Sequence, residues 1–273
     1  MNSYNKYFLI SDLDGTLINS QHTISQKNLN AIEYFVQQGG TFAIATGRTV
    51  QNIRPYIKNL ILNGPCILYN GSALFDFNRG TSLMTEHLEN HQLYDYITYC
   101  MKTFEHMVVE IFTTDMMYII TPEENVDPYV LFEKQYFERS TLDEVSKMSW
   151  VKMMLNDSHK NLQKAQEVLA DFGLASQVDS VFSHEHYFEI LKKDVSKGSA
   201  LRSIRKLPQY SNKIVVAVGD FDNDIEMIKA ADVGIAVDNA RDCVKQAANK
   251  ITVNNDQDAI YDIIFNIIPD LPE

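Results

Sequence analysis

Short runs of apolar residues recur toward both ends of the chain, and each of them stops at a polar cluster. Runs this short and this apolar are typical of strands that are buried on both faces of a parallel sheet. The runs, with the clusters that end them, are Tyr7–Ile10 before Ser11 and Asp12, Phe42–Ala45 before Thr46, Gly47 and Arg48, Cys66–Tyr69 before Asn70 and Gly71, Ile214–Val218 before Gly219 and Asp220, and Val233–Val237 before Asp238 and Asn239.

Segments with helical periodicity separate these runs. Ser25 is a suitable N-cap, and the helix that follows it is expected to end at Gly39. A second helix is predicted shortly after Asp220, whereas Pro55 would kink or end a helix in the segment after Arg48. Alternating strands and helices predict a doubly wound α/β domain, in which ligands bind beyond the carboxyl ends of the strands. Every polar cluster falls at such an end, so the pattern predicts a single site.

The middle of the chain has a different pattern. It combines a helix-like apolar stripe with strand-like runs at Val108–Phe112, Met117–Ile120 and Val151–Leu155, and none of these runs ends in a cluster of carboxylates. We therefore expect residues 84–185 to form an inserted α+β domain, and residues 1–83 and 186–273 to form the α/β domain together. Flexible joints are expected near Gly80–Thr85 and near Ser183–Tyr187.

Composition and charge narrow the possible functions. The chain has 273 residues and a formal net charge of -12, which repels nucleic acid and anionic membranes, so neither is expected as a partner. The same field repels phosphate, so a phosphate site would need local positive charge, such as a metal ion. Three widely spaced cysteines predict reduced thiols, and neither a signal peptide nor a long apolar run is visible. A cytoplasmic protein is expected, of unknown oligomeric state.

Two carboxylates, Asp12 and Asp14, follow the first strand on a loop with a glycine. One carboxylate can attack phosphorus and bind a hard cation, while the other can transfer a proton. Any Asp-x-Asp can also simply end a strand through an N-cap or an Asx-turn. The pair is therefore a candidate catalytic site that needs support from elsewhere in the chain.

A second acidic cluster, Gly219–Asp224, supplies that support. Like charges this close repel by about 4 kcal/mol at a separation of ~4 Å and an effective dielectric constant of ~20. Mg²⁺ would relieve the repulsion, because it prefers oxygen ligands. A solvated acidic loop is the alternative, but an apolar strand delivers this cluster to the same sheet edge as Asp12.

Two other candidates are weaker when taken alone. Thr46 and Gly47 offer a hydroxyl group and a backbone amide to phosphate oxygens. Lys197 opens another helix-like segment, although no local feature distinguishes it from the other basic residues.

Together these residues resemble a known family. The pattern D-x-D-G-T at Asp12, T-G-R at Thr46, a lysine before a helix at Lys197, and G-D-x-x-N-D at Gly219 is similar to the haloacid dehalogenase superfamily, and the spacing is similar to its Cof-type phosphatases. The motifs occur in the family's order and span residues 12–224. The insert lies where that subfamily has its cap domain, which would close over the site and select the leaving group.

The resemblance assigns a role to each motif position. Asp12 would be the nucleophile and a metal ligand. Asp14 would be the general acid and base, with its backbone carbonyl toward the metal. The other implied roles are phosphate binding by Leu13, Thr46, Gly47, Lys197 and Asn223, metal binding by Asp220 and Asp224, and substrate contact by Arg48 and Asn70. Relatives often have a glycine where this chain has Asp238, so a phosphate contact by Asn239 stays open.

The function that the resemblance implies is a Mg²⁺-dependent phosphomonoester hydrolase that acts on small phosphate esters through an aspartyl-phosphate. Sugar phosphates are the expected substrates; pyridoxal phosphate, nucleotides and flavin mononucleotide stay open. A phosphomutase is the alternative enzymatic function. A phospho-aspartate receiver module is the non-enzyme alternative, and the large insert and Asp14 count against it.

Overall fold

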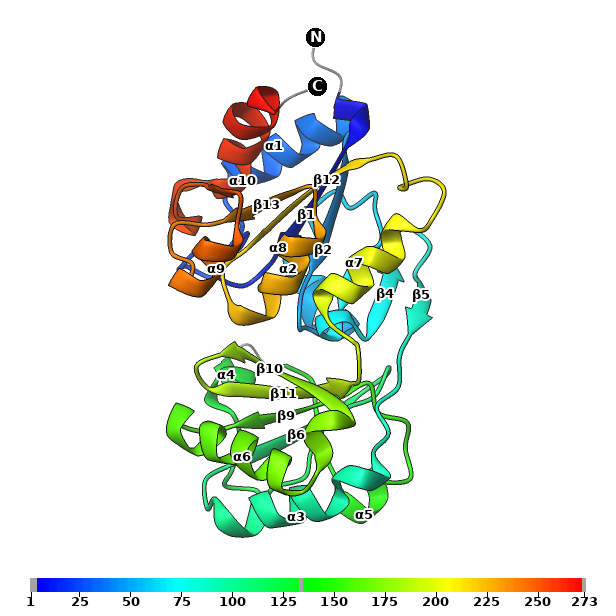
Figure 1. The fold of residues 1–273 in the computed structure, drawn as a ribbon, viewed down its shortest axis with the longest axis vertical. Coiled ribbons are helices and arrows are strands. Elements are labelled where there is room, and N and C mark those ends of the chain that lie inside the picture. The colour runs from blue at the N-terminus through cyan, green and yellow to red at the C-terminus, as the bar shows by residue number, and fades with distance from the viewer. Residues whose placement is uncertain (1–3, 133–134, 272–273) are drawn as a thin grey trace. The chain divides into compact units, whose positions relative to one another are not determined.

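The computed structural model describes residues 4–132 and 135–271, which divide into two compact units (Figure 1). The core unit comprises Met1–Met84 and Ser196–Glu273, and the inserted unit comprises Thr85–Val195. Each unit has its own sheet. The predicted fold class, an α/β parallel-sheet core with an inserted α+β domain, is confirmed. No helix in the described ranges is long and apolar enough to cross a membrane.

The core sheet has the strand order β14-β13-β12-β1-β2-β3-β4-β5. Neighbours from β14 to β3 pair in parallel, and β4 pairs antiparallel with β3. Every residue of β1 is buried, as expected for a strand covered on both faces. The strands are β1 Tyr7–Asp12, β2 Thr41–Ala45, β3 Cys66–Leu68, β4 Ala73–Asp76, β5 Thr81–Thr85, β12 Ile214–Gly219, β13 Val233–Ala236 and β14 Lys250–Ile251.

Helices follow the strands of the core unit much as the periodicity predicts. Ser25 caps α1 by accepting a hydrogen bond from the N–H of Asn28, and α2 continues through Pro55 before it ends at Ile57. Helix α1 packs against α10, and α7 packs against α8. The α-helices are α1 Gln26–Gln37, α2 Val50–Ile57, α7 Lys197–Arg205, α8 Ile225–Ala230, α9 Asp242–Ala247 and α10 Ala259–Asp262. The shorter helices are η1 Tyr4–Lys6, η2 Tyr69–Gly71, η5 Asp222–Asp224, η6 Asn255–Gln257, η7 Ile263–Ile267 and η8 Ile268–Asp270.

The inserted unit is built on a second sheet with the order β10-β11-β9-β6-β7-β8. Its neighbours pair antiparallel except for β7 with β8. The strands are β6 Val108–Phe112, β7 Met117–Ile119, β8 Glu138–Arg139, β9 Lys152–Asn156, β10 Val178–His184 and β11 Tyr187–Lys192. The helices are η3 His91–Leu93, α3 Tyr94–Thr103, α4 Pro128–Phe132, α5 Leu142–Val145, α6 His159–Asp171 and η4 Leu174–Ser176.

Alternation along these strands divides the inserted sheet into two unlike faces. Val109 and Ile111 of β6 join an apolar core with residues of α3 and α6, and these two helices lie together beside the sheet (Figure 1). Glu110 points to the opposite face, as do Lys152 and Glu189 on neighbouring strands, and all three are buried. The second face therefore buries charge where the first buries apolar side chains.

The second domain boundary differs from the one that the sequence suggested. The division falls between Val195 and Ser196, ten residues beyond the expected start at residue 186. Strand β11 pairs with both β9 and β10, so it belongs to the inserted unit. The joint expected near Ser183–Tyr187 is wrong for the same reason, because His184 and Tyr187 face each other in the β10–β11 hairpin.

Candidate active site

Four loops of the core unit start from one edge of its sheet. In the parallel ladders, Asp12 of β1 lies beside Ala45 of β2, and the ends of β3 and β12 lie next to these strands in turn. Since parallel neighbours run in the same direction, the residues that follow Asp12, Ala45, Leu68 and Gly219 emerge together. This is the edge at which the sequence pattern placed its polar clusters.

Lys197 connects the first of these loops to the last. Its Nζ donates to Oδ1 of Asp12 at 2.6 Å and to Oδ1 of Asp224 at 2.7 Å, and its side chain has no exposed surface. The second oxygen of Asp224 accepts from the backbone N–H groups of Asp220 and Phe221, at 3.0 and 3.2 Å. Three loop segments are thus held by one buried ammonium group and one buried carboxylate.

Local backbone geometry explains how Lys197 reaches the site. Ser196 caps α7, and Lys197 is the first residue of that helix. The turn after β3 comes so close that a Cβ atom on Gly71, whose φ is +112°, would lie 2.2 Å from the carbonyl oxygen of Ser196. Tyr69 and Asn70 before it also have positive φ, 51° and 54°. Only glycine fits this third position, which lets α7 begin against the turn.

The loop after Asp12 is fixed from two sides. Thr16 donates from its hydroxyl to Oδ1 of Asp220 at 2.9 Å, and Gly15, with φ of +76°, leaves room where a Cβ would lie 2.5 Å from Oδ2 of Asp220. Asn239 donates from its side chain to the carbonyl of Gly15 at 2.8 Å and accepts from the N–H of Asn255 at 2.9 Å. Asn239 therefore links the backbone of this loop to the backbone of Asn255. Sequence reasoning gave neither Thr16 nor Asn239 this supporting role, although Thr16 lies within the D-x-D-G-T motif.

The electrostatics of this cluster are unbalanced. Burial raises the pKa of Asp12 well above its usual value; Lys197 lowers it, and Asp224 and Asp220 raise it further. Burial, followed by the charge of Asp224, also raises the pKa of Asp220 to about 7, while the hydrogen bond from Thr16 lowers it. One ammonium group thus faces three carboxylates, and another cation would stabilise their ionised forms.

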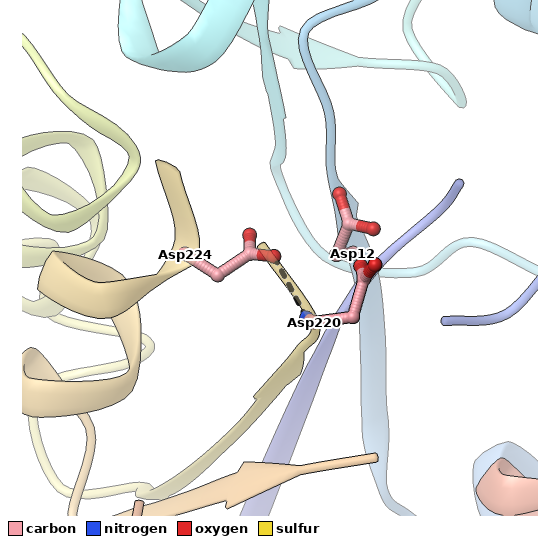
Figure 2. Close-up of side chains that lie close together, drawn as sticks. All are labelled: Asp12, Asp220 and Asp224. Carbon is pink, nitrogen blue, oxygen red and sulfur yellow. Dashed lines mark hydrogen bonds between the residues drawn. The ribbon is translucent and has the colours of Figure 1, made fainter. Parts of the chain in front are cut away.

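Asp12, Asp220 and Asp224 fit that cation. One carboxylate oxygen from each lies within 4.8 Å of the others, the only such group of potential metal ligands in the part of the chain that the structure describes. Figure 2 shows the three side chains gathered at the ends of β1 and β12. A donor set made only of oxygens suits a hard cation such as Mg²⁺. The Asp14 carboxylate is not part of this group, and metal binding by its backbone carbonyl stays a prediction.

Asp14 instead forms a bidentate ion pair with Arg48. The Nε and Nη2 atoms of Arg48 donate to its two carboxylate oxygens at 2.8 and 2.6 Å. The Arg48 side chain is only 8% exposed and lies over the ring of Tyr56, 4.6 Å from the centroid, whereas the Asp14 side chain is 47% exposed. The two motifs that begin at Asp12 and Thr46 are thereby joined through charged side chains.

Asn70, which is buried, and Asn223, which is partly buried, form an amide pair at the same edge. The Nδ2 atom of Asn223 donates to Oδ1 of Asn70 at 3.0 Å. The remaining side-chain atoms, Nδ2 of Asn70 and Oδ1 of Asn223, are buried without a hydrogen-bond partner. Unpaired buried polar atoms are costly, so a donor left open here suits an oxygen-rich ligand. Asn223 contacts Asn70, and Asp224 is the residue of this motif that orients Lys197.

Thr46 is also buried at this edge, where its hydroxyl accepts from the N–H of Arg48 at 3.2 Å. Its carbonyl accepts from the N–H of Asn70 at 3.0 Å, which ties the second loop to the third. Leu13 and Gly47 lie in the first and second loops, as their motifs require. Phosphate binding by their backbone amides stays a prediction.

The chain matches the model of the haloacid dehalogenase-like hydrolase family over residues 9–264, and it therefore belongs to that family. Over 253 residues it is 26% identical to the 5-amino-6-(5-phospho-D-ribitylamino)uracil phosphatase YcsE of Bacillus subtilis, covering 91% of this chain and 90% of that protein. It is 28% identical to the pyridoxal phosphate phosphatase YbhA of Escherichia coli over 271 residues, covering 93% and 96% of the two chains.

A solved structure supports the same relationship. A haloacid dehalogenase-like hydrolase from Bacteroides thetaiotaomicron superimposes with a TM-score of 0.79 at 26% identity, over 96% of this chain and 99% of that one. The predicted phosphatase of the haloacid dehalogenase superfamily is confirmed at this level. A non-enzymatic receiver module is thereby excluded.

Proposed function

We propose that this protein is a magnesium-dependent phosphomonoester hydrolase that acts on small phosphate esters through an aspartyl-phosphate on Asp12. The observation that carries the proposal is the buried Asp12–Lys197–Asp224 arrangement, with Asp220 close enough to complete a cation site. It combines a candidate nucleophile, a fixed positive charge and metal ligands at one sheet edge. Mg²⁺ would be held by Asp12, Asp220 and Asp224, and when bound it would offset the charge of the carboxylates and of the phosphoryl group.

The proposed reaction has two steps, each with a defined proton transfer. In the first, an oxygen of Asp12 bonds to phosphorus while the ester P–O bond breaks, and Asp14 gives its proton to the departing oxygen. In the second, Asp14 takes a proton from water, the water oxygen bonds to phosphorus, and the bond to Asp12 breaks. Lys197 and Thr46 are proposed to hold the phosphoryl oxygens, together with the open amide of Asn70.

Sugar phosphates are the proposed substrates, with the inserted unit selecting the leaving group. The two curated relatives named above act, according to their names, on different metabolites, one a ribitylaminouracil phosphate and the other pyridoxal phosphate. What these compounds share is a phosphate ester on a small organic molecule. These relatives therefore support small phosphate esters as the substrate class of this protein, and they do not select one member of that class.

A phosphate-release screen over a panel of phosphorylated metabolites, with Mg²⁺, with Ca²⁺ or with excess EDTA, tests the proposal. We expect turnover with Mg²⁺, inhibition by Ca²⁺, whose larger shell would occupy the oxygens of the nucleophile, and none with EDTA. Full turnover in EDTA would contradict the metal-based mechanism. Asp220→Asn removes one of the proposed metal ligands. Asp222→Asn is its matched control, because Asp222 belongs to the same motif but its carboxylate pairs with Arg241 and contacts Cys243.

A further inference from the structure

The charged face of the inserted sheet contains a carboxylate that the proposed mechanism does not use. Glu110 lies on β6 and has no exposed surface, and neither of its carboxylate oxygens has a hydrogen-bond partner among the described residues. Buried acceptors are nearly always paired with a donor, so each exception needs an explanation. Two unpaired oxygens on one buried side chain point to a ligand that supplies the donors.

Glu110 belongs to a buried cluster with excess negative charge. The charged groups that act on it, within the ranges that the structure describes, are the carboxylates of Asp127 and Glu189 and the ammonium group of Lys152. Lys152 donates to Glu189 at 2.6 Å, whereas Asp127 accepts from the hydroxyl of Tyr187 at 2.8 Å. Three carboxylates therefore share one ammonium group, and a further cation would stabilise their ionised forms.

The chemistry of this cluster favours an ammonium group as the ligand. A proton can neutralise Glu110, but it gives the second carboxylate oxygen no donor. The described residues of the inserted unit offer no group of three converging metal ligands, so a metal ion would find too few of them here. An ammonium group carries both a positive charge and three N–H donors, and its hydrogen bonds to a carboxylate are charge-assisted. A hydroxyl group supplies one donor and no charge.

The exposure of neighbouring side chains indicates the side from which a ligand would approach Glu110. Residues that face each other on paired strands share a face of the sheet, as do residues two positions apart on one strand. By this register, Asn156 of β9 and Tyr187 of β11 lie on the face of Glu110, one row nearer the turn between β10 and β11. Both are partly exposed, whereas Glu110 and Glu189 are buried. Exposure thus increases from Glu110 toward that turn.

We propose that Glu110 binds an ammonium group of the substrate, so that the preferred substrates are small phosphate esters whose leaving group carries a primary amine. Asp127, whose charge also acts on Glu110, strengthens this selection. The inference rests on the proposed function, in which the inserted unit selects the leaving group, and it narrows sugar phosphates to amino sugar phosphates among other amines. Glu110 determines specificity, and the phosphoryl transfer stays at Asp12.

Pairs of phosphate esters that differ only in an amine or a hydroxyl group test the proposal on the wild type. The pairs are phosphoethanolamine with glycol phosphate, pyridoxamine phosphate with pyridoxine phosphate, and glucosamine with glucose, both phosphorylated at the primary hydroxyl. With Mg²⁺ present, the amine of at least one pair should have a kcat/KM roughly tenfold or more above that of its hydroxyl partner, as expected for a hydrogen bond to a charged group. If no pair favours the amine by more than about twofold, the inference is overturned without any variant.

Variants of Glu110 assign the preference to this residue. Glu110→Gln keeps the size of the side chain and removes its charge, so the ratio of kcat/KM between amine and hydroxyl should fall by roughly tenfold in the favoured pair. Glu110→Asp keeps the charge on a shorter side chain and should lower the ratio less, and it gives a second measurement should Glu110→Gln not fold. A ratio that stays at the wild-type value in whichever variant folds would overturn the assignment.

Glu138 provides a matched control, because it lies on β8 of the same sheet and is exposed. Glu138→Gln removes the same charge from the inserted unit and should leave the ratio within about twofold of the wild type, since solvent screens exposed charges. An equal fall at Glu138 and Glu110 would show a general charge effect and overturn the assignment. Should the wild type release phosphate from no ester, an activated aryl phosphate included, the proposed function itself would fail. Release from the activated ester without a preference for amines overturns only the inference.

Discussion

Each unit of this protein buries a lysine against carboxylates, but the two lysines lie in different settings. Lys197 of the core unit contacts Asp12 and Asp224 where two strands end and a helix begins. Lys152 of the inserted unit donates to Glu189 at 2.6 Å from within a strand, and both side chains are 3% exposed. The first cluster lies at the ends of secondary-structure elements, and the second pair lies within a ladder of backbone hydrogen bonds.

Both clusters contain more carboxylates than one lysine can neutralise. The excess negative charge is compensated in a different way in each cluster. In the core unit the carboxylate oxygens of three aspartates converge, so a metal ion can compensate them. In the inserted unit the surplus falls on Glu110, whose two oxygens are buried without a hydrogen-bond partner. Burial, followed by the charge of Asp127, raises the pKa of Glu110 to about 8, so at neutral pH a proton neutralises it. Convergence of carboxylate oxygens, rather than buried charge as such, distinguishes the candidate active site from the cluster in the inserted unit.

The largest expected effect is on catalysis, and it should follow a change in the core cluster but not one in the cluster of the inserted unit. Asp12→Asn removes the proposed nucleophile, so phosphate release should fall by about 10⁴-fold or more. Covalent labelling of the protein by a phosphate ester, trapped in acid, should disappear. Glu189→Gln in the inserted unit should still be labelled by an activated ester. Labelling of Asp12→Asn on the same loop would contradict the role of Asp12 as nucleophile and with it the distinction between the two clusters.

Asp14→Asn should show a smaller effect that depends on the leaving group. A nitrophenolate hardly needs a proton, whereas a sugar alkoxide does, and positioned proton transfer contributes roughly 10²–10⁴-fold. With the activated ester, rapid-quench kinetics should show a burst of aspartyl-phosphate followed by slow hydrolysis. Wild-type rates on sugar phosphates would contradict the role given to Asp14.

Lys152→Met should affect stability. It leaves Glu189 buried without its ammonium partner, and breaking a buried pair in this way costs about 3–5 kcal/mol. Denaturant unfolding would measure the change in the free energy of unfolding. The double variant Lys152→Met with Glu189→Met removes both charges and should recover most of the loss. A double variant as unstable as the single one would show that packing, and not the unpaired charge, sets the cost.

The smallest effect concerns the pH dependence of stability. The pKa of Glu110 is raised in the folded protein from an ordinary 4.5 to about 8, so between these values the folded state holds a proton that the unfolded state lacks. This contribution to stability is fully present below pH 4.5 and is lost as the pH rises through 8, with a slope of up to about 1.4 kcal/mol per pH unit. Glu110→Gln should flatten the curve over that window in urea titrations. An unchanged slope would mean that Glu110 is ionised at neutral pH.

The sequence was most informative about strands whose position depends on a single type of residue. Apolar runs ending in polar clusters predicted β1, β2 and β12, because strands buried on both faces need continuous apolar residues. The edge strands β5 and β14 were missed, since half-exposed or exposed strands lack that signal. The boundary after Val195 was misplaced because the β10–β11 hairpin turns at His184–Tyr187 without glycine.

The sequence predicted which residues form the candidate site, but it did not predict how they contact one another. The motifs identified Asp12, Lys197 and Asp224, yet nothing local in the sequence shows that one lysine bridges two carboxylates that lie far apart in the chain. The pairing of Arg48 with Asp14 was also missed, because a residue expected to contact substrate gave no reason to look for a partner inside the protein. Contacts of this kind depend on the tertiary fold.

The link between Lys197 and Asp12 also bears on how the molecule is made, because the two residues are 185 positions apart. At typical translation speeds of about 5–20 residues per second, Asp12 leaves the ribosome roughly 10–40 s before its partner. During that interval β1 lacks its neighbour β12, while residues 85–195 of the inserted unit are being synthesised. The nascent chain therefore carries an open, apolar strand edge until α7 and β12 arrive. Chaperone demand should concentrate in that interval, before the Asp12 carboxylate has the Lys197 ammonium group beside it.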